Sequence, residues 1–79
     1  MLKLRADYSK KVDCQYSVYV SFNYNPFYVN FMKGLKYRSY DPNTKEWEVG
    51  QQSYDEMMNM IEFNDILYNY EDFRRSVDY

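Results

Sequence analysis

The stretch LKYRSYDPNTKEWEVG at residues 35–50 decides the fold class of this chain. Residues 37–41 and 45–49 alternate in polarity, as a strand with one buried face does. Between them, the sequence DPNT has Asp, Pro and Asn at positions where each residue type favours a tight turn. We therefore predict a β-hairpin in which Trp47 faces the core and which ends at Gly50.

The residues before this hairpin predict a long strand. Apolar residues occupy six consecutive even positions from 12 to 22, and the odd positions between them are mostly polar. Alternation of this length is typical of a strand with one buried face. We expect Tyr19, which lies on the polar face, to be exposed and to contact a partner. The apolar positions are Val12, Cys14, Tyr16, Val18, Val20 and Phe22.

A short helix follows the long strand. In the sequence NPFYVNFMKG, Asn25 can cap a helix of residues 25–33, and Pro26 fits its first turn, where no amide donor is needed. Gly34 is placed to end this helix because glycine adopts the left-handed conformation at little cost.

Two further helices are predicted after the hairpin. The sequence SYDE at residues 53–56 matches a capping box, in which Ser53 and Glu56 bond to each other's backbone. For residues 63–77 we favour a helix over an edge strand, because apolar residues recur there at helical spacing. These residues are Ile66, Tyr70, Phe73 and Val77.

With residues 2–6 as a first alternating strand, the order of elements is β-β-α-β-β-α-α. Strands that are close in sequence pair as hairpins, and the helices then cover one face of the sheet. We predict an α+β fold: a two-layer sandwich of an antiparallel sheet of about four strands with two or three short helices, in one domain of residues 1–79.

The composition argues against several classes of function. One cysteine allows no disulfide within the chain, and the absence of histidine removes the commonest metal ligand and general base. The carboxylates match no calcium loop. We expect no catalytic residues, no metal or other cofactor and no small-molecule substrate. No apolar run approaches the ~18 residues that span a bilayer, so we expect a cytoplasmic protein without membrane contact.

Charge is distributed unevenly along the chain. The net charge is -2, but residues 1–40 hold seven basic and two acidic residues, whereas residues 41–79 hold three basic and ten acidic ones. Basic residues cluster between the first helix and the hairpin, where they can contact phosphates, and a tyrosine among them can stack on a base. They can equally be ordinary solubilising charges. The candidate nucleic-acid contacts are Lys33, Lys36, Arg38, Tyr40 and Lys45.

The acidic second half predicts a different kind of contact. Eleven tyrosines exceed what one small core can use, and tyrosine is enriched at protein interfaces. Acidic residues beside exposed tyrosines can meet a basic groove of another protein, or they can simply form the solvated faces of two helices. The candidate partner contacts are Tyr19, Tyr68, Tyr70, Glu71 and Asp72.

Residues 20–61 resemble the HARP domain, which accompanies SNF2-type annealing helicases that rewind DNA at stalled replication forks. The sequence YDPNTKEW at 40–47 matches the Tyr-Asp-Pro-x-Thr-Lys-x-Trp hairpin of that family, and SYDEMMNMI follows where its closing helix is expected. The resemblance implies contact with DNA. The chain departs from the helicases because it has no Gly-x-x-x-x-Gly-Lys loop and no ATPase motor. We therefore expect a freestanding module, or a decoy built on the same fold.

Two functions are therefore predicted. The first is a small non-enzymatic binding module that contacts forked or single-stranded DNA through a basic edge formed by the helix and the hairpin. The second is a phage-type inhibitor whose acidic, tyrosine-rich surface blocks a nucleic-acid-processing enzyme, such as a bacterial immune (CRISPR-type) nuclease. The partner is accordingly DNA or a basic nucleic-acid-binding protein, and homodimerisation is left open.

Overall fold

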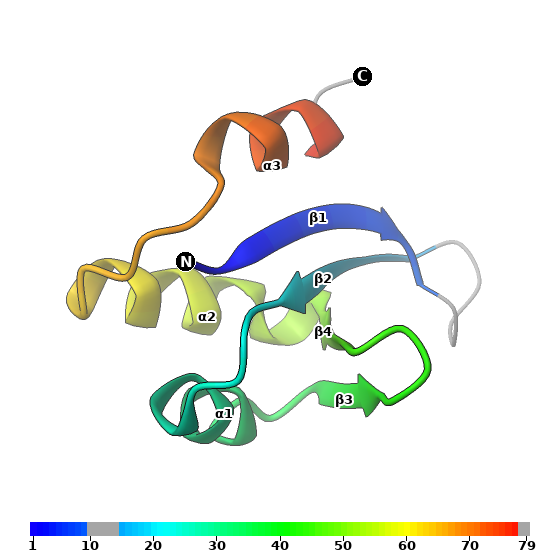
Figure 1. Cartoon of the computed structure of the whole chain (residues 1–79). Coiled ribbons are helices and arrows are strands. Elements are labelled where there is room, and N and C mark those ends of the chain that lie inside the picture. The colour runs from blue at the N-terminus through cyan, green and yellow to red at the C-terminus, as the bar shows by residue number, and fades with distance from the viewer. Residues whose placement is uncertain (10–14, 78–79) are drawn as a thin grey trace.

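The computed structural model describes residues 1–9 and 15–77, which form one antiparallel sheet with helices packed against it (Figure 1). The element order is the predicted β-β-α-β-β-α-α, so the α+β fold class is confirmed. The strands are β1 (Lys3–Tyr8), β2 (Tyr16–Ser21), β3 (Arg38–Asp41) and β4 (Glu46–Gly50). The helices are α1 (Pro26–Lys33), α2 (Tyr54–Phe63) and α3 (Tyr70–Val77), and a 3-10 turn, η1 (Gln51–Ser53), precedes α2.

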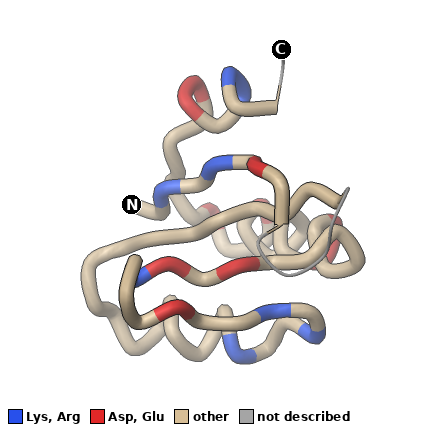
Figure 2. Tube along the Cα trace, turned by 90° about the vertical axis from the view of Figure 1, so that its right-hand side faces the viewer, with Lys and Arg blue, Asp and Glu red and all other residues tan. Residues whose placement is uncertain are grey.

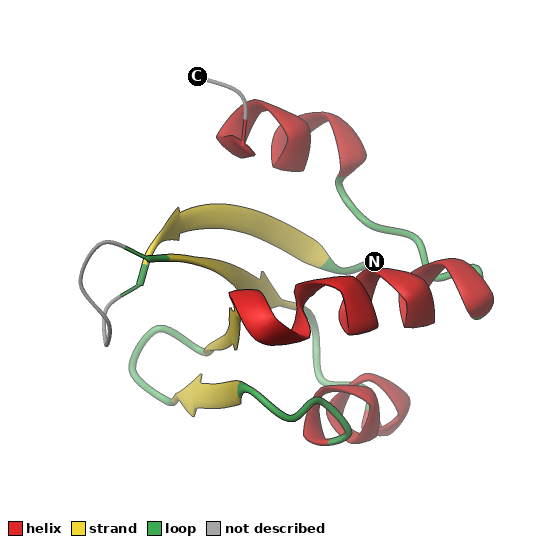
Figure 3. Cartoon of the chain, turned by 180° about the vertical axis from the view of Figure 1, so that it is seen from behind, coloured by secondary structure: helices red, strands yellow, loops and turns green. Residues whose placement is uncertain are grey.

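The four strands lie in the order β1-β2-β4-β3, and every neighbouring pair is antiparallel. The predicted hairpin is therefore the β3–β4 pair, in which Tyr40 is directly opposite Trp47. Trp47 is in turn opposite Val20 of β2, so the two central strands present their apolar residues on one face. Seen from behind, α2 crosses in front of this face and α1 lies beside it (Figure 3).

The core lies between that face of the sheet and the helices. Strands β2 and β4 contribute valines, and the predicted helical stripes contribute Met57 and Ile61 of α2 and Phe73 of α3, all of which are buried. Burying these side chains supplies the main stabilising free energy of a chain this small. The buried core residues are Leu2, Leu4, Val18, Val20, Phe31, Met32, Leu35, Val49, Met57, Ile61, Ile66 and Phe73.

The first helix begins and ends as predicted, but the conformation of the residue that ends it differs. The Asn25 side chain accepts a hydrogen bond from the Phe27 amide, with Pro26 at the first position of the helix. Gly34 ends the helix, but in the right-handed region, with φ -77° and ψ -15°, so the prediction of a left-handed cap is wrong. Its amide donates to the carbonyls of Asn30 and Phe31, and this tightened last turn satisfies them without a positive φ.

The predicted capping box at Ser53 is also wrong. The Ser53 side chain makes no hydrogen bond to the start of α2; its hydroxyl instead accepts from the Tyr37 amide at 2.9 Å. Turn η1 leads directly into α2, and the Tyr54 amide donates to the Gln51 carbonyl. The serine therefore ties the entrance of β3 to the helix, and it is almost fully buried.

The predicted strand of residues 12–22 is only partly open to comparison. Val12 and Cys14 lie outside the described residues, and β2 covers Tyr16–Ser21. Within it, Val18 and Val20 face the core as the alternation predicts. Phe22 lies just past the end of the strand and packs partly buried against the core.

The last segment combines both alternatives that the sequence left open. Tyr70–Val77 is a helix, as favoured, and it lies along the outer edge of β1 (Figure 1). The residues just before it run beside β1 instead, with a parallel bridge between Leu2 and Tyr68. The Leu2 amide donates to the Leu67 carbonyl at 3.0 Å, and the Asn69 amide donates to the Leu2 carbonyl at 3.2 Å.

Side chains complete the cover of the β1 edge. The Asn69 side chain accepts from the Leu4 amide at 2.7 Å and donates to the Leu4 carbonyl at 3.0 Å. Further along, the Ala6 amide donates to the Ser76 hydroxyl at 2.9 Å. The outward amides of Leu2, Leu4 and Ala6 and the carbonyls of Leu2 and Leu4 thus have partners within the chain, which hinders pairing with another molecule.

None of the helices within residues 1–9 and 15–77 is both long enough and apolar enough to cross a membrane.

Candidate nucleic-acid interface

The five predicted nucleic-acid contacts lie at the end of α1, in the link to β3 and on the β3–β4 hairpin. The four cations are exposed, and 48% of Tyr40 is exposed. Within the described part of the chain none of these cations forms a salt bridge, so their charges are available to a ligand. Figure 2 shows the arrangement along the chain, with acidic segments in the middle and basic segments above and below them.

The structure divides four of these five residues between two pockets, whereas Lys33, in the last turn of α1, lines neither of them. Lys36 and Arg38 line a shallow polar pocket of about 300 Å³ at the start of β3, together with Tyr37. The Lys36 ammonium lies 5.5 Å from the centre of the Tyr37 ring, within the reach of a cation–π interaction. Glu48 also lines this pocket, but its carboxylate accepts hydrogen bonds from the hydroxyls of Ser9 and Ser17. A phosphate in this pocket would therefore meet two cations and one carboxylate.

Tyr40 and Lys45 line a second hollow, of about 530 Å³, which we call the aromatic cleft. Its rings come from the end of β2, from the loop before α1 and from the hairpin. The rings of Tyr40 and Trp47 are 5.0 Å apart between centroids and inclined at 54°. The lining residues are Phe22, Asn23, Tyr24, Val29, Tyr40, Lys45 and Trp47.

Five of the seven residues that line the aromatic cleft were not predicted as contacts: Phe22, Asn23, Tyr24, Val29 and Trp47. Phe22 was assigned to the core by its even position, and Asn23 and Tyr24 were assigned no role. Trp47 was expected to be a core residue; it packs against the core and also lines the cleft. One feature of the sequence could have indicated the cleft: Tyr24 is an aromatic residue in a polar run between strand and helix. In the structure it is 83% exposed.

Lys45 has an unusual backbone conformation. Its φ is +57°, in the left-handed region that glycine adopts far more readily than residues with a Cβ. It lies where the turn passes into β4, and its side chain is exposed. The turn before it is held by the Asp41 side chain, which accepts from the Asn43 amide at 2.9 Å.

The opposite face of the hairpin is acidic. Carboxylates of Asp41, Glu46 and Glu48 line a smaller hollow of about 200 Å³ there. The Arg5 guanidinium donates to both oxygens of Glu46, at 2.9 and 3.1 Å, and this hydrogen bonding raises the pKa of Arg5. A phosphate would be repelled from this hollow. Glu48 also lines the pocket that holds Lys36 and Arg38, so the two cations lie at the margin of this acidic face.

Tyr19 lies on that acidic face and is buried, so its predicted exposure is wrong. Only 3% of the residue is exposed. Arg5 is directly opposite it in the sheet, and the guanidinium lies 4.4 Å from the ring centre. The Tyr19 hydroxyl donates to the Tyr8 carbonyl at 3.1 Å. A long cationic side chain therefore covers this tyrosine, although its strand position faces away from the helices.

The other predicted partner contacts lie far from Tyr19 in the fold. Tyr68 is half-buried against the core, and this burial raises its pKa. Tyr70, Glu71 and Asp72 are exposed in the first turn of α3. The five residues thus do not form one surface, although three of them are accessible together.

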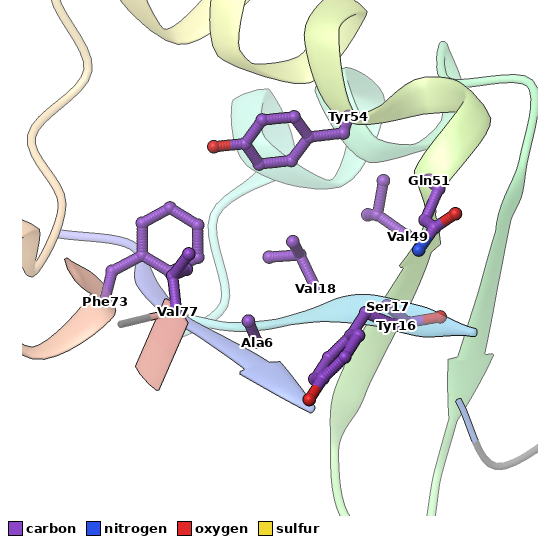
Figure 4. A pocket seen from close by; sticks show the side chains of 9 residues that line it. All are labelled: Ala6, Tyr16, Ser17, Val18, Val49, Gln51, Tyr54, Phe73 and Val77. Atoms are coloured by element: carbon purple, nitrogen blue, oxygen red, sulfur yellow. The ribbon is translucent and has the colours of Figure 1, made fainter. Parts of the chain in front are cut away.

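Another hollow, of about 560 Å³, lies elsewhere, between α3, the start of α2 and the sheet. Figure 4 shows the ring of Tyr54 above this hollow and the ring of Phe73 at one side, with Val18 and Ala6 on the strands below. No charged side chain is found among the described residues that line it, so it offers a phosphate no cation.

Comparison with known proteins gives one match. The family model described as HepA-related protein (HARP) matches residues 18–65, which is more than half of the chain. No curated protein and no solved structure matches. The matched residues run from within β2 to just past α2, so they contain the aromatic cleft and all four exposed cations, whereas β1 and α3 lie outside them.

Proposed function

The chain belongs to the HepA-related protein (HARP) family, and we propose that it is a small non-enzymatic accessory module of DNA processing. In this proposal the module contacts forked or single-stranded DNA through the side of the hairpin and α1 that carries the exposed cations. Supporting it, Lys33, Lys36, Arg38 and Lys45 are exposed and unpaired within the matched, described segment.

The chemistry of this contact would be mainly electrostatic. Lysine and arginine side chains bind phosphate oxygens and release the counterions that surround DNA, which makes the affinity depend strongly on salt. Phosphate contacts position a protein without reading sequence. The hollow lined by Asp41 and Glu46 would be turned away from the DNA, because like charges repel.

Fluorescence anisotropy with labelled single-stranded, duplex and forked DNA, at low and physiological salt, tests this proposal. The variant Lys36→Glu with Arg38→Glu should lose binding. A matched control, Arg74→Glu with Arg75→Glu, changes the net charge equally but on the exposed surface of α3. Equal losses in both variants, or no binding by the unaltered protein at low salt, would contradict the proposal.

A protein partner is the second candidate. It is favoured by one observation: Tyr70, Glu71 and Asp72 are exposed together on α3, outside the segment that matches the family. Reversing the two acidic charges, Glu71→Lys with Asp72→Lys, should abolish capture of a basic nucleic-acid-processing enzyme and should not weaken binding of DNA. Loss of capture on Lys36→Glu with Arg38→Glu instead would argue against this surface.

A further inference from the structure

The aromatic cleft combines features that the other hollows lack. Four rings line it, with one ammonium, one side-chain amide and, among the described lining residues, no carboxylate. The hollow beneath α3 has rings but no cation, and the one on the opposite face of the hairpin is acidic. At about 530 Å³ the cleft falls within the range of about 300–1,000 Å³ of clefts that hold small organic groups.

The rings of the cleft are arranged to receive another ring. Tyr40 and Trp47 are directly opposite each other in the sheet, yet their planes are inclined at 54°, so they do not stack on each other. Phe22 is held edge-on by Tyr28, with 5.3 Å between centroids and 72° between planes. Tyr24 is 83% exposed beside them. Aromatic rings that are accessible in this way are the platforms on which unpaired bases stack.

Lys45 adds an independent observation. At this position a glycine would adopt the positive φ without strain, but the chain has a lysine whose φ is +57°. Backbone strain of this kind is found preferentially at binding and catalytic sites. Here it is associated with an exposed ammonium at the rim of the aromatic cleft.

We propose that the aromatic cleft takes one unpaired base of single-stranded DNA, with Lys45 binding the phosphate next to it. The base would stack against Tyr40, Trp47 or Tyr24, and the Asn23 amide, which both donates and accepts hydrogen bonds, would lie near its edge. This inference rests on the proposed function. It adds that the protein binds bases as well as the phosphate backbone.

Trp47 provides a direct readout because it is the single tryptophan of the chain. The probes are a short oligothymidylate and an oligonucleotide of the same length whose sugars carry no bases. Stacking should quench the Trp47 emission with the first probe and not with the second, and the first should bind about tenfold more tightly or more. Equal binding of both without quenching overturns the inference and leaves the proposed function intact. If neither probe binds at low salt, both fail.

The variant Lys45→Gly separates a binding role from a structural one. Glycine relieves the strain at a positive φ, so the variant should unfold at a higher concentration of urea. It should nevertheless bind oligothymidylate several-fold more weakly, because the rim loses its cation, whereas Lys45→Arg should retain the affinity. Lys3→Ala, an exposed cation of β1 outside the matched segment, serves as the control. A Lys45→Gly variant with unchanged affinity would overturn the role of Lys45.

Ring variants test the stacking itself. Tyr24→Ala removes a side chain that is 83% exposed, so it leaves the fold intact. Tyr40→Leu retains apolar area and removes the ring. Together they should weaken binding of the base-bearing probe about tenfold or more and leave the abasic probe unaffected. An equal loss for both probes would show that the rings act only through the fold and would overturn the inference.

Discussion

The side-chain amide of Asn69 makes the two hydrogen bonds to Leu4 that a neighbouring strand would make. An amide has a donor and an acceptor at the spacing needed to pair with one residue's backbone. Because Leu4 is buried in the core, its backbone groups depend on this one side chain for their outward partners.

Replacing Asn69 with alanine should be costly. The variant leaves an amide and a carbonyl of β1 without protein partners, and we expect the free energy of unfolding to fall by about 2–3 kcal/mol. Urea denaturation measures it. The control is Asn64→Ala, whose amide donates to the Met60 carbonyl at the exposed end of α2 and should cost less than about 1 kcal/mol. Similar losses of stability in the two variants would show that the hydrogen bonds of Asn69 to Leu4 have no special importance.

Tyr68 should make stability depend on pH in alkaline solution. Burial raises its pKa above the ordinary value, so the folded state favours the neutral phenol. The resulting stabilisation is complete below the unfolded pKa of about 10 and is lost as pH rises through the folded pKa. Urea denaturation at pH about 9 and about 11 should show a smaller loss of stability for Tyr68→Phe than for Tyr24→Phe, whose ring is exposed. The same loss of stability in both variants would show that Tyr68 is not the source of the pH dependence.

For a single residue, the sequence predicts which face of the sheet the side chain lies on better than it predicts the neighbouring side chains. Alternation correctly puts Tyr19 opposite the core face, but the neighbours that cover it, such as Arg5, are distant in sequence. Likewise, the Ser53 hydroxyl matches a cap motif and instead binds Tyr37 across the fold. Both outcomes depend on tertiary neighbours that no local pattern specifies.

The elements of the sheet differ most at its two edges. β1 is covered by the residues around α3, whereas no described strand pairs with the outer side of β3. The Gly50 amide bonds to the Tyr37 carbonyl, and the alternation of an antiparallel pair then turns the backbone groups of Arg38 and Tyr40 outward. Strand β3 has four residues and charged flanks, features that limit unwanted pairing.

Hydrogen exchange should distinguish the two edges. The amides of Leu2, Leu4 and Ala6 should exchange more slowly than those of Arg38 and Tyr40, by about tenfold or more, because only the first group has partners within the described chain. In a second measurement, Ser76→Ala should accelerate the Ala6 amide alone. Similar exchange rates at the two edges would contradict the conclusion that only the β1 edge is covered.

The elements that follow from local sequence were predicted well. The hairpin needs only its turn and its alternation, and α1 needs only its cap and its proline. The residues between α2 and α3 were ambiguous because their backbone partners lie on β1, more than 60 positions away. Pairing at that separation leaves no periodic pattern in the segment itself.

At the scale of the whole molecule, the charge distribution along the chain is a poor guide to its surface. The basic first half and the acidic second half pair in space, as Arg5 does with Glu46. The exposed cations that remain are Lys33, Lys36, Arg38 and Lys45, together with others outside the site. The aromatic cleft was not predicted as a unit, because its residues come from three separate segments.

The salt dependence of DNA binding should report the number of these contacts. Four phosphate contacts on a single strand predict a slope of about -3 for the logarithm of the affinity against the logarithm of the salt concentration. Replacing Lys36 and Arg38 with alanine should make the slope shallower by about 1.4, whereas Arg74→Ala with Arg75→Ala should not change it. Anisotropy titrations over a range of salt measure the slope; one that is unchanged in the first variant would place the contacts elsewhere.

The covered β1 edge also limits how copies of this protein can assemble. A sheet with two open edges can add molecules at both ends and grow into a filament, whereas this one has a single edge available for growth. In edge-to-edge association each molecule can therefore bind only one other molecule. Two copies joined through β3 would form a pair that cannot grow further, because residues 67–76 cover the β1 edge of each copy.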